Sequence, residues 1–253
     1  MENCISARQN SFLFAIEQTK LQARERQGIG TLNEKSIHAI LKNFYAPYAI
    51  HQEVKVNGYV ADIMINDEII EIQTRHFNTL RKKLDAFLPD YKVTIVHPIA
   101  HTKWISWINE QTGEVSKKRK SPKQGSIFHI IRELYRIKPY LSHPHLHLII
   151  PLLEVEEYRL LNGWSHDKKK GASRHDGYPS RLVDEIYLSK PADYVLLLPA
   201  NLQAPFTSKD YAKLAKITPS QASTALGILY NLGIVERIGK KGNAFLYQKA
   251  INL

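Results

Sequence analysis

Apolar positions follow two spacings in the first hundred residues of this 253-residue chain. Ile37, Ile40, Leu41 and Phe44 recur at helical spacing, whereas short apolar runs typical of strands follow at 50–56, 60–65 and 69–74. A second helical stripe contains Leu80, Leu84, Phe87 and Leu88, and another strand-like run covers 92–96. We expect Asn78 to cap the second helix and Pro89 to lie just past its end. The predicted order is helix, three strands, helix, strand.

The second and third strands are expected to form a hairpin with Asn66 and Asp67 in its turn, because both residue types tolerate tight turns. In that register Asp62 faces Glu71, and Gln73 points to the same side two residues later. Facing carboxylates repel each other, and a divalent cation between them would remove the repulsion. The other face, with Ile63, Ile65, Ile70 and Ile72, is predicted to be core. A solvated acidic hairpin is the alternative interpretation.

This order of elements, with Asp62 in the second strand and Glu71-Ile-Gln73 in the third, resembles the PD-(D/E)XK, or restriction-endonuclease-like, fold over about residues 31 to 100. The resemblance implies an α/β nuclease core in which Asp62 and Glu71 bind Mg²⁺ (or Mn²⁺), and a glutamate of the first helix, here Glu34, assists catalysis. Two positions depart from the motif: Ala61 replaces its proline, and Gln73 replaces its lysine.

Catalytic roles for Glu34 and for its neighbour His38 compete with a simpler explanation. Thr31-Leu-Asn-Glu34 fits a helix capping box, in which the glutamate needs no other purpose. Gln73 can orient a water molecule or bind metal through its amide oxygen, but it lacks the positive charge of lysine. Arg75, Lys82 and Lys83 are therefore the candidates for stabilising charge that develops during the reaction. Arg81, Lys82 and Lys83 are all expected on the outer side of their helix.

Residues 101–199 are interpreted as a linking or extension region. Trp104 and Trp107 form either a core cluster or a base-stacking platform, and core is the preferred interpretation. A basic run at Lys117, Lys118, Arg119 and Lys120 is a candidate phosphate contact on a basic chain. His143, His145 and His147 alternate, which would place three imidazoles on one strand face, but no acidic or cysteine partner for a zinc ion accompanies them.

Residues 200–253 resemble a winged helix-turn-helix. Thr207 is expected to cap one helix, and Thr218-Pro-Ser-Gln221 forms a capping box for a second, which ends at Gly233. A hairpin around Gly239-Lys-Lys-Gly-Asn243 would follow. The resemblance implies that the second helix enters the major groove of DNA. The residues expected to contact bases or phosphates are Ser220, Gln221, Ser223 and Thr224, with Lys240 and Lys241 on the wing. A winged helix used for protein contacts is the alternative.

Charge and composition favour a nucleic-acid partner. The formal net charge is +11 and the isoelectric point is near 9.5, values typical of proteins that bind polyanions. A single cysteine excludes an internal disulfide and is typical of a reducing, cytoplasmic setting. No apolar run is long enough to span a membrane, and 1–30 is expected to be a helical lead-in.

The sequence therefore predicts a nuclease-like core at 31–100 and a DNA-binding module at 200–253, acting together as a metal-dependent endonuclease on double-stranded DNA. A degenerate nuclease fold that only binds DNA as a regulator is one alternative, favoured by the missing lysine. An RNA nuclease is another. Whether the protein acts as a homodimer stays open.

Overall fold

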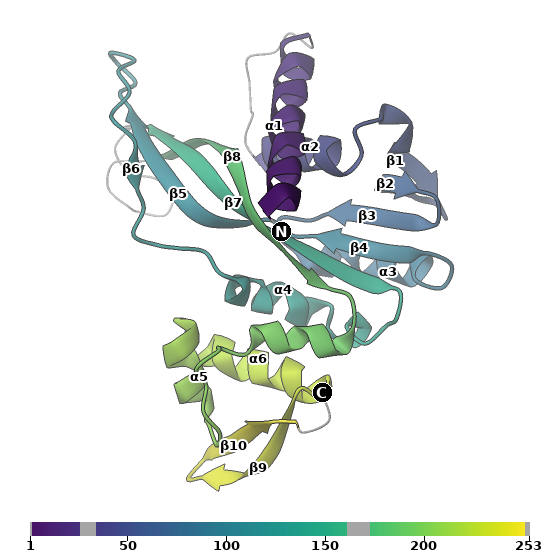
Figure 1. Ribbon diagram of the computed structural model, residues 1–253, viewed down its shortest axis with the longest axis vertical. Helices are drawn as coiled ribbons and strands as arrows, with labels where there is room; N and C mark the ends of the chain where they lie inside the picture. Colours follow the sequence, from purple (N-terminus) through teal and green to yellow (C-terminus); the bar gives the residue numbers. More distant parts are fainter. Residues whose placement is uncertain (1, 26–33, 161–172, 251–253) are drawn as a thin grey trace.

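The computed structural model describes residues 2–25, 34–160 and 173–250, which form a mixed α/β structure (Figure 1). The described residues contain one large mixed sheet of eight strands in the order β1-β2-β3-β4-β7-β5-β6, with β8 paired to β7. The first four strands are β1 (Gln52–Val56), β2 (Tyr59–Ile65), β3 (Glu68–Ile72) and β4 (Lys92–Val96). Neighbours are antiparallel from β1 to β3, and β3 and β4 are parallel.

The β2–β3 hairpin has the predicted register. Ile63 pairs with Ile70 and Met64 with Ile69, and Asn66 adopts φ 52° in the turn. Ile63, Ile70 and Ile72 are buried together, as predicted, in a cluster with residues from two helices. These helices are α1 (Glu2–Glu25) and α2 (Glu34–Tyr45). The hairpin prediction is confirmed because its turn and its alternation are both local properties of the sequence.

Residues 101–199, interpreted above as a linking or extension region, supply half of the sheet. They contain most of β5 (Ile99–Ile108), the short β6 (Arg119–Lys120), β7 (Leu146–Leu160) and β8 (Ser173–Leu188). Strand β7 pairs in parallel first with β4 and then with β5, and its other edge pairs with β8. Strands β5, β7 and β8 continue past β4 as a long arm (Figure 1).

The two helices of one face are tied to this sheet by a buried carboxylate. Arg8 of α1 donates two hydrogen bonds to Glu185 of β8, at 2.8 and 2.7 Å. The hydroxyl of Tyr45, at the end of α2, donates to the same carboxylate at 2.6 Å. Burial, followed by the negative charge of Glu185, raises the pKa of Tyr45, so its hydroxyl stays protonated and keeps donating. The contact fixes α1 and α2 relative to each other.

The other face of the sheet is covered by short helices. A 3₁₀ turn (Phe77–Leu80) leads directly into α3 (Arg81–Phe87), and a second one (Ile127–Ile130) leads into α4 (Ile131–Arg136). Residue His76, in the left-handed conformation at φ 60°, precedes the first turn, and no side chain caps it. The prediction that Asn78 caps this helix is wrong, because the helical segment already starts at Phe77. Within the described residues, every helix is too short or too polar to cross a lipid bilayer.

The C-terminal unit, residues 200–250, consists of two helices and a hairpin. They are α5 (Ser208–Ala215), α6 (Pro219–Asn231), β9 (Val235–Lys241) and β10 (Ala244–Lys249). Thr207 caps α5 and Thr218 caps α6, as predicted, and each cap forms a capping box. Gly233 adopts φ 71° just after α6, a conformation that glycine accepts without steric cost.

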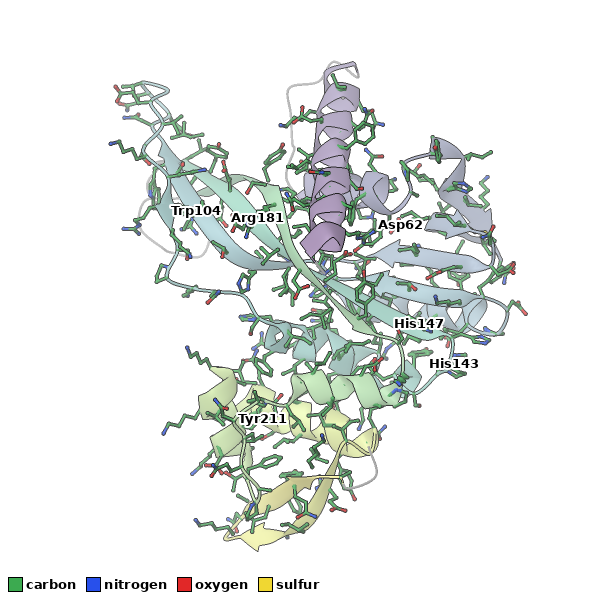
Figure 2. The ribbon with its side chains drawn as sticks, in the orientation of Figure 1. Asp62, Trp104, His143, His147, Arg181 and Tyr211 are labelled. Carbon is green, nitrogen blue, oxygen red and sulfur yellow. The ribbon has the colours of Figure 1, made fainter. Side chains whose placement is uncertain are left out.

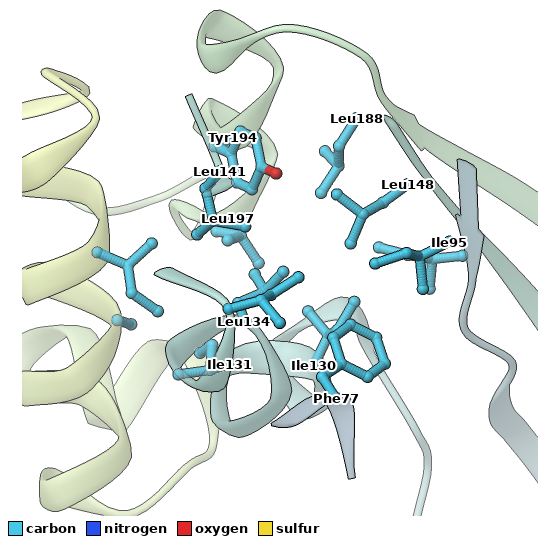
Figure 3. Packing of buried hydrophobic residues seen from close by; sticks show 14 of the residues in the cluster. Phe77, Ile95, Ile130, Ile131, Leu134, Leu141, Leu148, Leu188, Tyr194 and Leu197 are labelled. Carbon is cyan, nitrogen blue, oxygen red and sulfur yellow. The ribbon is translucent and has the colours of Figure 1, made fainter. Parts of the chain in front are cut away.

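The C-terminal unit shares its core with the sheet. One continuous cluster of buried residues runs from Ile95 and Leu148 of the sheet, through Ile131 and Leu134 of α4, to Leu229 of α6. Figure 3 shows its middle section, where Leu134 and Leu197 lie between the sheet and the C-terminal helices. The unit is therefore fixed to the sheet by apolar packing.

Candidate functional site

The candidate site lies where strands β2 and β3 separate, here called the fork. Their pairing ends at Ile63 and Ile70, one step before Asp62 and Glu71 would form the next pair. Beyond that point the backbone N–H of Ile72 donates to Asp62 Oδ2 at 2.8 Å. A side-chain carboxylate thus takes the place of a strand carbonyl, which opens the hairpin and places Asp62 between the strands. Figure 2 labels Asp62 at this position.

Asp62 is held in its ionised form. Burial alone would raise its pKa, but a hydrogen bond from His38, the charge of that imidazole and the Ile72 N–H together lower it below its usual value. The distance from His38 Nε2 to Asp62 Oδ2 is 3.2 Å. His38 comes from α2, whose apolar stripe packs on the opposite side of the hairpin. His38, a candidate from the sequence, therefore contacts a predicted metal ligand: it orients one oxygen of Asp62 and leaves the other available.

Glu71 is the more deeply buried carboxylate, with an exposed fraction of 3%. Burial, with the nearby charge of Asp62, raises its pKa to about 7, against the opposing effect of Lys83. The ammonium of Lys83 donates to both oxygens of Glu71, at 2.9 and 2.7 Å, and to the carbonyl of Val60 at 2.7 Å. Two carboxylates and one ammonium thus meet at the fork.

Lys83 places a positive charge at the fork. It is one of the three cations proposed from the sequence, but the prediction that it points outward is wrong. Arg81 and Lys82 are exposed, whereas Lys83 turns toward the sheet because α3 packs directly over β3 and β4. The side-chain amide of Gln73 instead donates to the carbonyl of Arg75. The lysine charge therefore reaches the fork from a helix, and not from the strand that carries Glu71.

Glu34 and Gln73 have weaker structural links to the fork. Glu34 is the first described residue of α2, but its side chain and Thr31 lie outside the described residues, so the predicted capping box stays a prediction. The backbone carbonyl of Gln73 lies 2.8 Å from Nδ1 of the buried His97. Burial lowers the pKa of His97, so this imidazole is neutral and holds the chain just after Glu71.

The donor set at the fork fits a hard divalent cation. Mg²⁺ binds through one or two carboxylates together with waters and substrate phosphates, so Asp62 and Glu71 are sufficient. Among the described residues, no cluster of three or more His, Cys, Asp or Glu side chains is arranged to hold a metal on its own. A cation at the fork would accordingly depend on water and substrate oxygens for its remaining ligands, and Glu71 would have to lose its proton.

Comparison with known proteins places residues 35–189 in a family described as "Domain of unknown function (DUF8091)". The chain belongs to this family. A relative in Treponema pallidum (strain Nichols), named as an uncharacterized protein, is 32% identical over 228 residues, which cover 87% of each chain. No solved structure matches the chain. The DUF8091 region includes the fork, α3 and the arm, whereas α5, α6 and the C-terminal hairpin follow it.

The basic run of the DUF8091 region lies on the arm. Arg119 and Lys120 form β6, which pairs with β5 at Ile105 and Trp104. The ammonium of Lys118 is 2.9 Å from Glu156 and lies over the Trp104 ring at 5.6 Å. Trp104 and Trp107 are only partly buried, so neither belongs to the core. In Figure 2, Trp104 on the arm and Asp62 at the fork appear on opposite sides of α1.

The histidines of the DUF8091 region do not form the predicted row. Strand β7 begins at Leu146, so His147 alone of the three is a strand residue. His143 Nδ1 accepts from the backbone of His145 at 3.2 Å, and His145 Nδ1 lies 3.0 Å from the carbonyl of Leu88. These contacts to backbone atoms orient the imidazoles of His143 and His145.

The residues of the C-terminal unit that were predicted to contact DNA differ in how exposed their side chains are. Ser220 and Ser223 are exposed on α6. Gln221 accepts from the backbone and hydroxyl of Thr218 at 3.1 and 3.0 Å, and Thr224 donates to the carbonyl of Ser220 at 3.0 Å. The capping contacts therefore occupy Gln221. Lys240 and Lys241 are both exposed, in strand β9 and not in the turn.

Sequence reasoning missed Arg237, which precedes the two lysines on β9. Its guanidinium lies 4.1 Å from the centre of the Phe245 ring and 4.5 Å from that of Tyr230. Lys240 also lies over Phe245, at 5.0 Å. The basic residues of β9 and the aromatic residues Phe245 and Tyr247 of β10 indicate this stacking, but only once the register of the two strands is known. The hairpin thus carries a cationic surface supported by aromatic rings.

Proposed function

We propose that this protein is a metal-dependent endonuclease of the PD-(D/E)XK type, which hydrolyses phosphodiester bonds in DNA at the fork and contacts DNA through the C-terminal unit. One observation carries the proposal: Asp62 accepts from the backbone of Ile72, next to Glu71, where β2 and β3 separate, and the ammonium of Lys83 binds Glu71 in the same place. The strand order and orientations from β1 to β4 support the resemblance on which the proposal rests.

Each residue at the fork has a distinct part in this proposal. Asp62, kept ionised by His38, and Glu71, once deprotonated, would hold the cation. Bound Mg²⁺ polarises the scissile phosphate and lowers the pKa of water near it. Lys83 would stabilise the negative charge that grows on phosphate oxygens as water adds to phosphorus and the bond to the sugar oxygen breaks. The partly buried site strengthens each of these interactions.

Lys83 also weakens the main argument for a regulator without activity. That alternative followed from glutamine at position 73, where the motif has lysine. A lysine contacting the motif glutamate from α3 restores the combination of two carboxylates and one cation, although by a different route through the fold. The C-terminal unit favours binding to duplex DNA, since Ser220, Ser223, Lys240 and Lys241 are exposed on α6 and β9.

The proposal is tested by incubating the protein with plasmid DNA, single-stranded DNA and RNA, each with Mg²⁺, Mn²⁺ or EDTA. The expected result is metal-dependent cleavage of DNA that is lost in EDTA. Asp62→Asn removes one charge and little volume, so it should lower the rate by a factor on the order of 10³ while DNA binding persists. Cleavage of RNA alone would favour the RNA nuclease, and no cleavage in any combination would favour the regulator. Full activity in Asp62→Asn would place catalysis elsewhere.

A further inference from the structure

A cavity of about 620 Å³ lies between α1 and α2, next to the segment that follows α2. This volume is within the range of small-molecule sites in proteins. Asn43 forms part of its wall and is fixed in place, because its side chain donates to Thr19 at 2.9 Å and accepts from Gln52 at 3.1 Å. The contact of Arg8 and Tyr45 with Glu185 holds the two helices together beside it. The cavity is therefore bounded by rigid elements.

The lining of the cavity is aromatic and polar but uncharged. None of the ten described residues that line it is an Asp, Glu, Lys, Arg or His. Phe14 of α1 and Tyr48 after α2 project from opposite elements, with exposed fractions of 58% and 70%. The amide side chains of Asn10 and Gln18 make no hydrogen bond to the part of the chain that the structure describes. Rings and unused amides thus face the same space.

This combination selects for a particular class of ligand. A phosphate or carboxylate would find no cation in the lining to balance its charge. A planar, uncharged heteroaromatic ring can stack on Phe14 or Tyr48, and its edge can exchange hydrogen bonds with amide groups, each of which offers both donors and an acceptor. Nucleobases have this chemistry. Stacking on aromatic side chains is also how proteins commonly bind unpaired bases.

The cavity lies close to the fork along a single helix. His38, which contacts Asp62, and Asn43, in the cavity wall, are both in α2. Their separation of five positions corresponds to about 7.5 Å along the helix axis and about 140° around it. Stacked nucleotides rise about 3.4 Å each, so the two sites are roughly two nucleotides apart along this axis. A flexible, unpaired strand whose phosphate is at the fork therefore has to pass around α2 to bring a nearby base to the cavity.

We propose that the cavity binds one unpaired base of the nucleic-acid substrate, beside the phosphate held at the fork. This inference rests on the proposed function for the identity of the fork, but base binding itself does not require cleavage. The substrate class is accordingly nucleic acid with an unpaired nucleotide, such as a bulge, a flap or a single strand. Bases within an intact duplex would first have to be unstacked, which costs a few kcal/mol.

The test compares affinities in EDTA, where no hydrolysis occurs. One duplex carries a single-nucleotide bulge, and a second carries an abasic residue at the bulge. Wild-type protein should bind the base-bearing duplex roughly 5- to 150-fold more tightly, the range expected for one stacked base. Phe14→Ala and Tyr48→Ala should reduce this ratio toward one. Tyr135→Ala removes a tyrosine of similar exposure, 59%, from α4, and should leave the ratio unchanged.

Equal binding of the two duplexes by wild-type protein, or a ratio preserved in both cavity variants, would overturn the cavity proposal. Because Phe14 and Tyr48 are largely exposed, thermal denaturation should show that both variants fold normally. The assay separates this proposal from the proposed function. If the protein binds the base-bearing duplex more tightly but cleaves nothing with any metal, the nuclease proposal is wrong and the cavity proposal stands. If it cleaves DNA but binds the two duplexes equally, the cavity proposal is wrong and the nuclease proposal stands.

Discussion

The fork and the C-terminal unit use charge in opposite ways. At the fork, Glu71 is almost completely buried and Asp62 is partly buried, and each carboxylate has a cationic or imidazole partner within 3.2 Å. In the C-terminal unit, residues 200–250 contain seven Lys and Arg against two Asp and Glu, and the lysines of β9 are exposed. Buried charges change their pKa and act strongly over short distances, whereas exposed charges attract a polyanion and are weakened by salt. Chemistry is expected in the first region and recognition in the second.

After Asp62→Asn, replacing Lys83 should give the largest effect among the variants that test this comparison. Lys83→Met leaves Glu71 without its buried partner and removes the charge next to the scissile phosphate. We expect the single-turnover cleavage rate to fall by a factor on the order of 10², the usual cost of losing one stabilising group. Lys82→Met is the matched control, because Lys82 is the exposed neighbour on the same helix. Equal rates in the two variants would contradict the assignment of Lys83.

Glu71 should also affect the pH dependence of stability. Its pKa in the folded protein is about 7, raised from a usual 4.5. Between these values the folded state binds more protons than the unfolded state, so the contribution of Glu71 to stability falls as pH rises from about 4.5 to 7. Glu71→Gln removes this titration. The difference in free energy of unfolding, variant minus wild type, should therefore increase as the pH rises through that interval, by on the order of 1–3 kcal/mol.

Denaturant unfolding in EDTA at pH 4.5, 6 and 7.5 provides the measurement for this prediction. Glu68→Gln is a suitable control, since Glu68 is in the same strand but is only half-buried and contacts Lys92 at its surface. A constant difference between Glu71→Gln and wild type across this range would mean that Glu71 titrates normally and is not held in a desolvated site.

The smallest expected effect is in the C-terminal unit. Replacing Lys240 and Lys241 together with Ala should weaken DNA binding for all sequences and reduce the slope of log affinity against log salt by about two, if each lysine neutralises one phosphate. Lys209 and Lys213, exposed on α5, provide a control with the same change in net charge. An unchanged slope in the β9 variant would mean that these lysines of the hairpin do not contact DNA phosphates. Deleting the whole unit is a poorer test, because α6 shares a core with α4.

Features that depend on neighbouring residues could be predicted from the sequence. The turn at Asn66 and Asp67 fixes the hairpin register, and the boxes at Thr218 and Thr207 fix two helix starts. Asn78 shows the limit of such rules. A side chain suited to capping is insufficient when the helical segment already begins at Phe77, directly after the left-handed backbone of His76.

Features that depend on distant residues could not be predicted in the same way. Lys83 and Glu71 are twelve positions apart, and the sequence alone does not show how α3 is rotated above β3. The length of the strands in the arm could not be predicted from the sequence either. Strand β7 continues to Leu160 through Glu154, Glu156 and Glu157, although buried and half-exposed positions already alternate from Leu146 onward. The first half of the strand is a nearly continuous apolar run, and the glutamates of the second half end the uniform apolar pattern by which such a strand is recognised.

The central claim is that Asp62 and Glu71 together bind one divalent cation, and calorimetric titration with Mn²⁺ tests it most directly. With a pKa of about 7, Glu71 is ionised in about one tenth of molecules at pH 6 and about nine tenths at pH 8. We predict one site per chain, roughly tenfold tighter at pH 8 than at pH 6, because binding requires the deprotonated ligand. Asp62→Asn should abolish it. Absence of Mn²⁺ binding at pH 8, or equal binding by Asp62→Asn, would contradict the account.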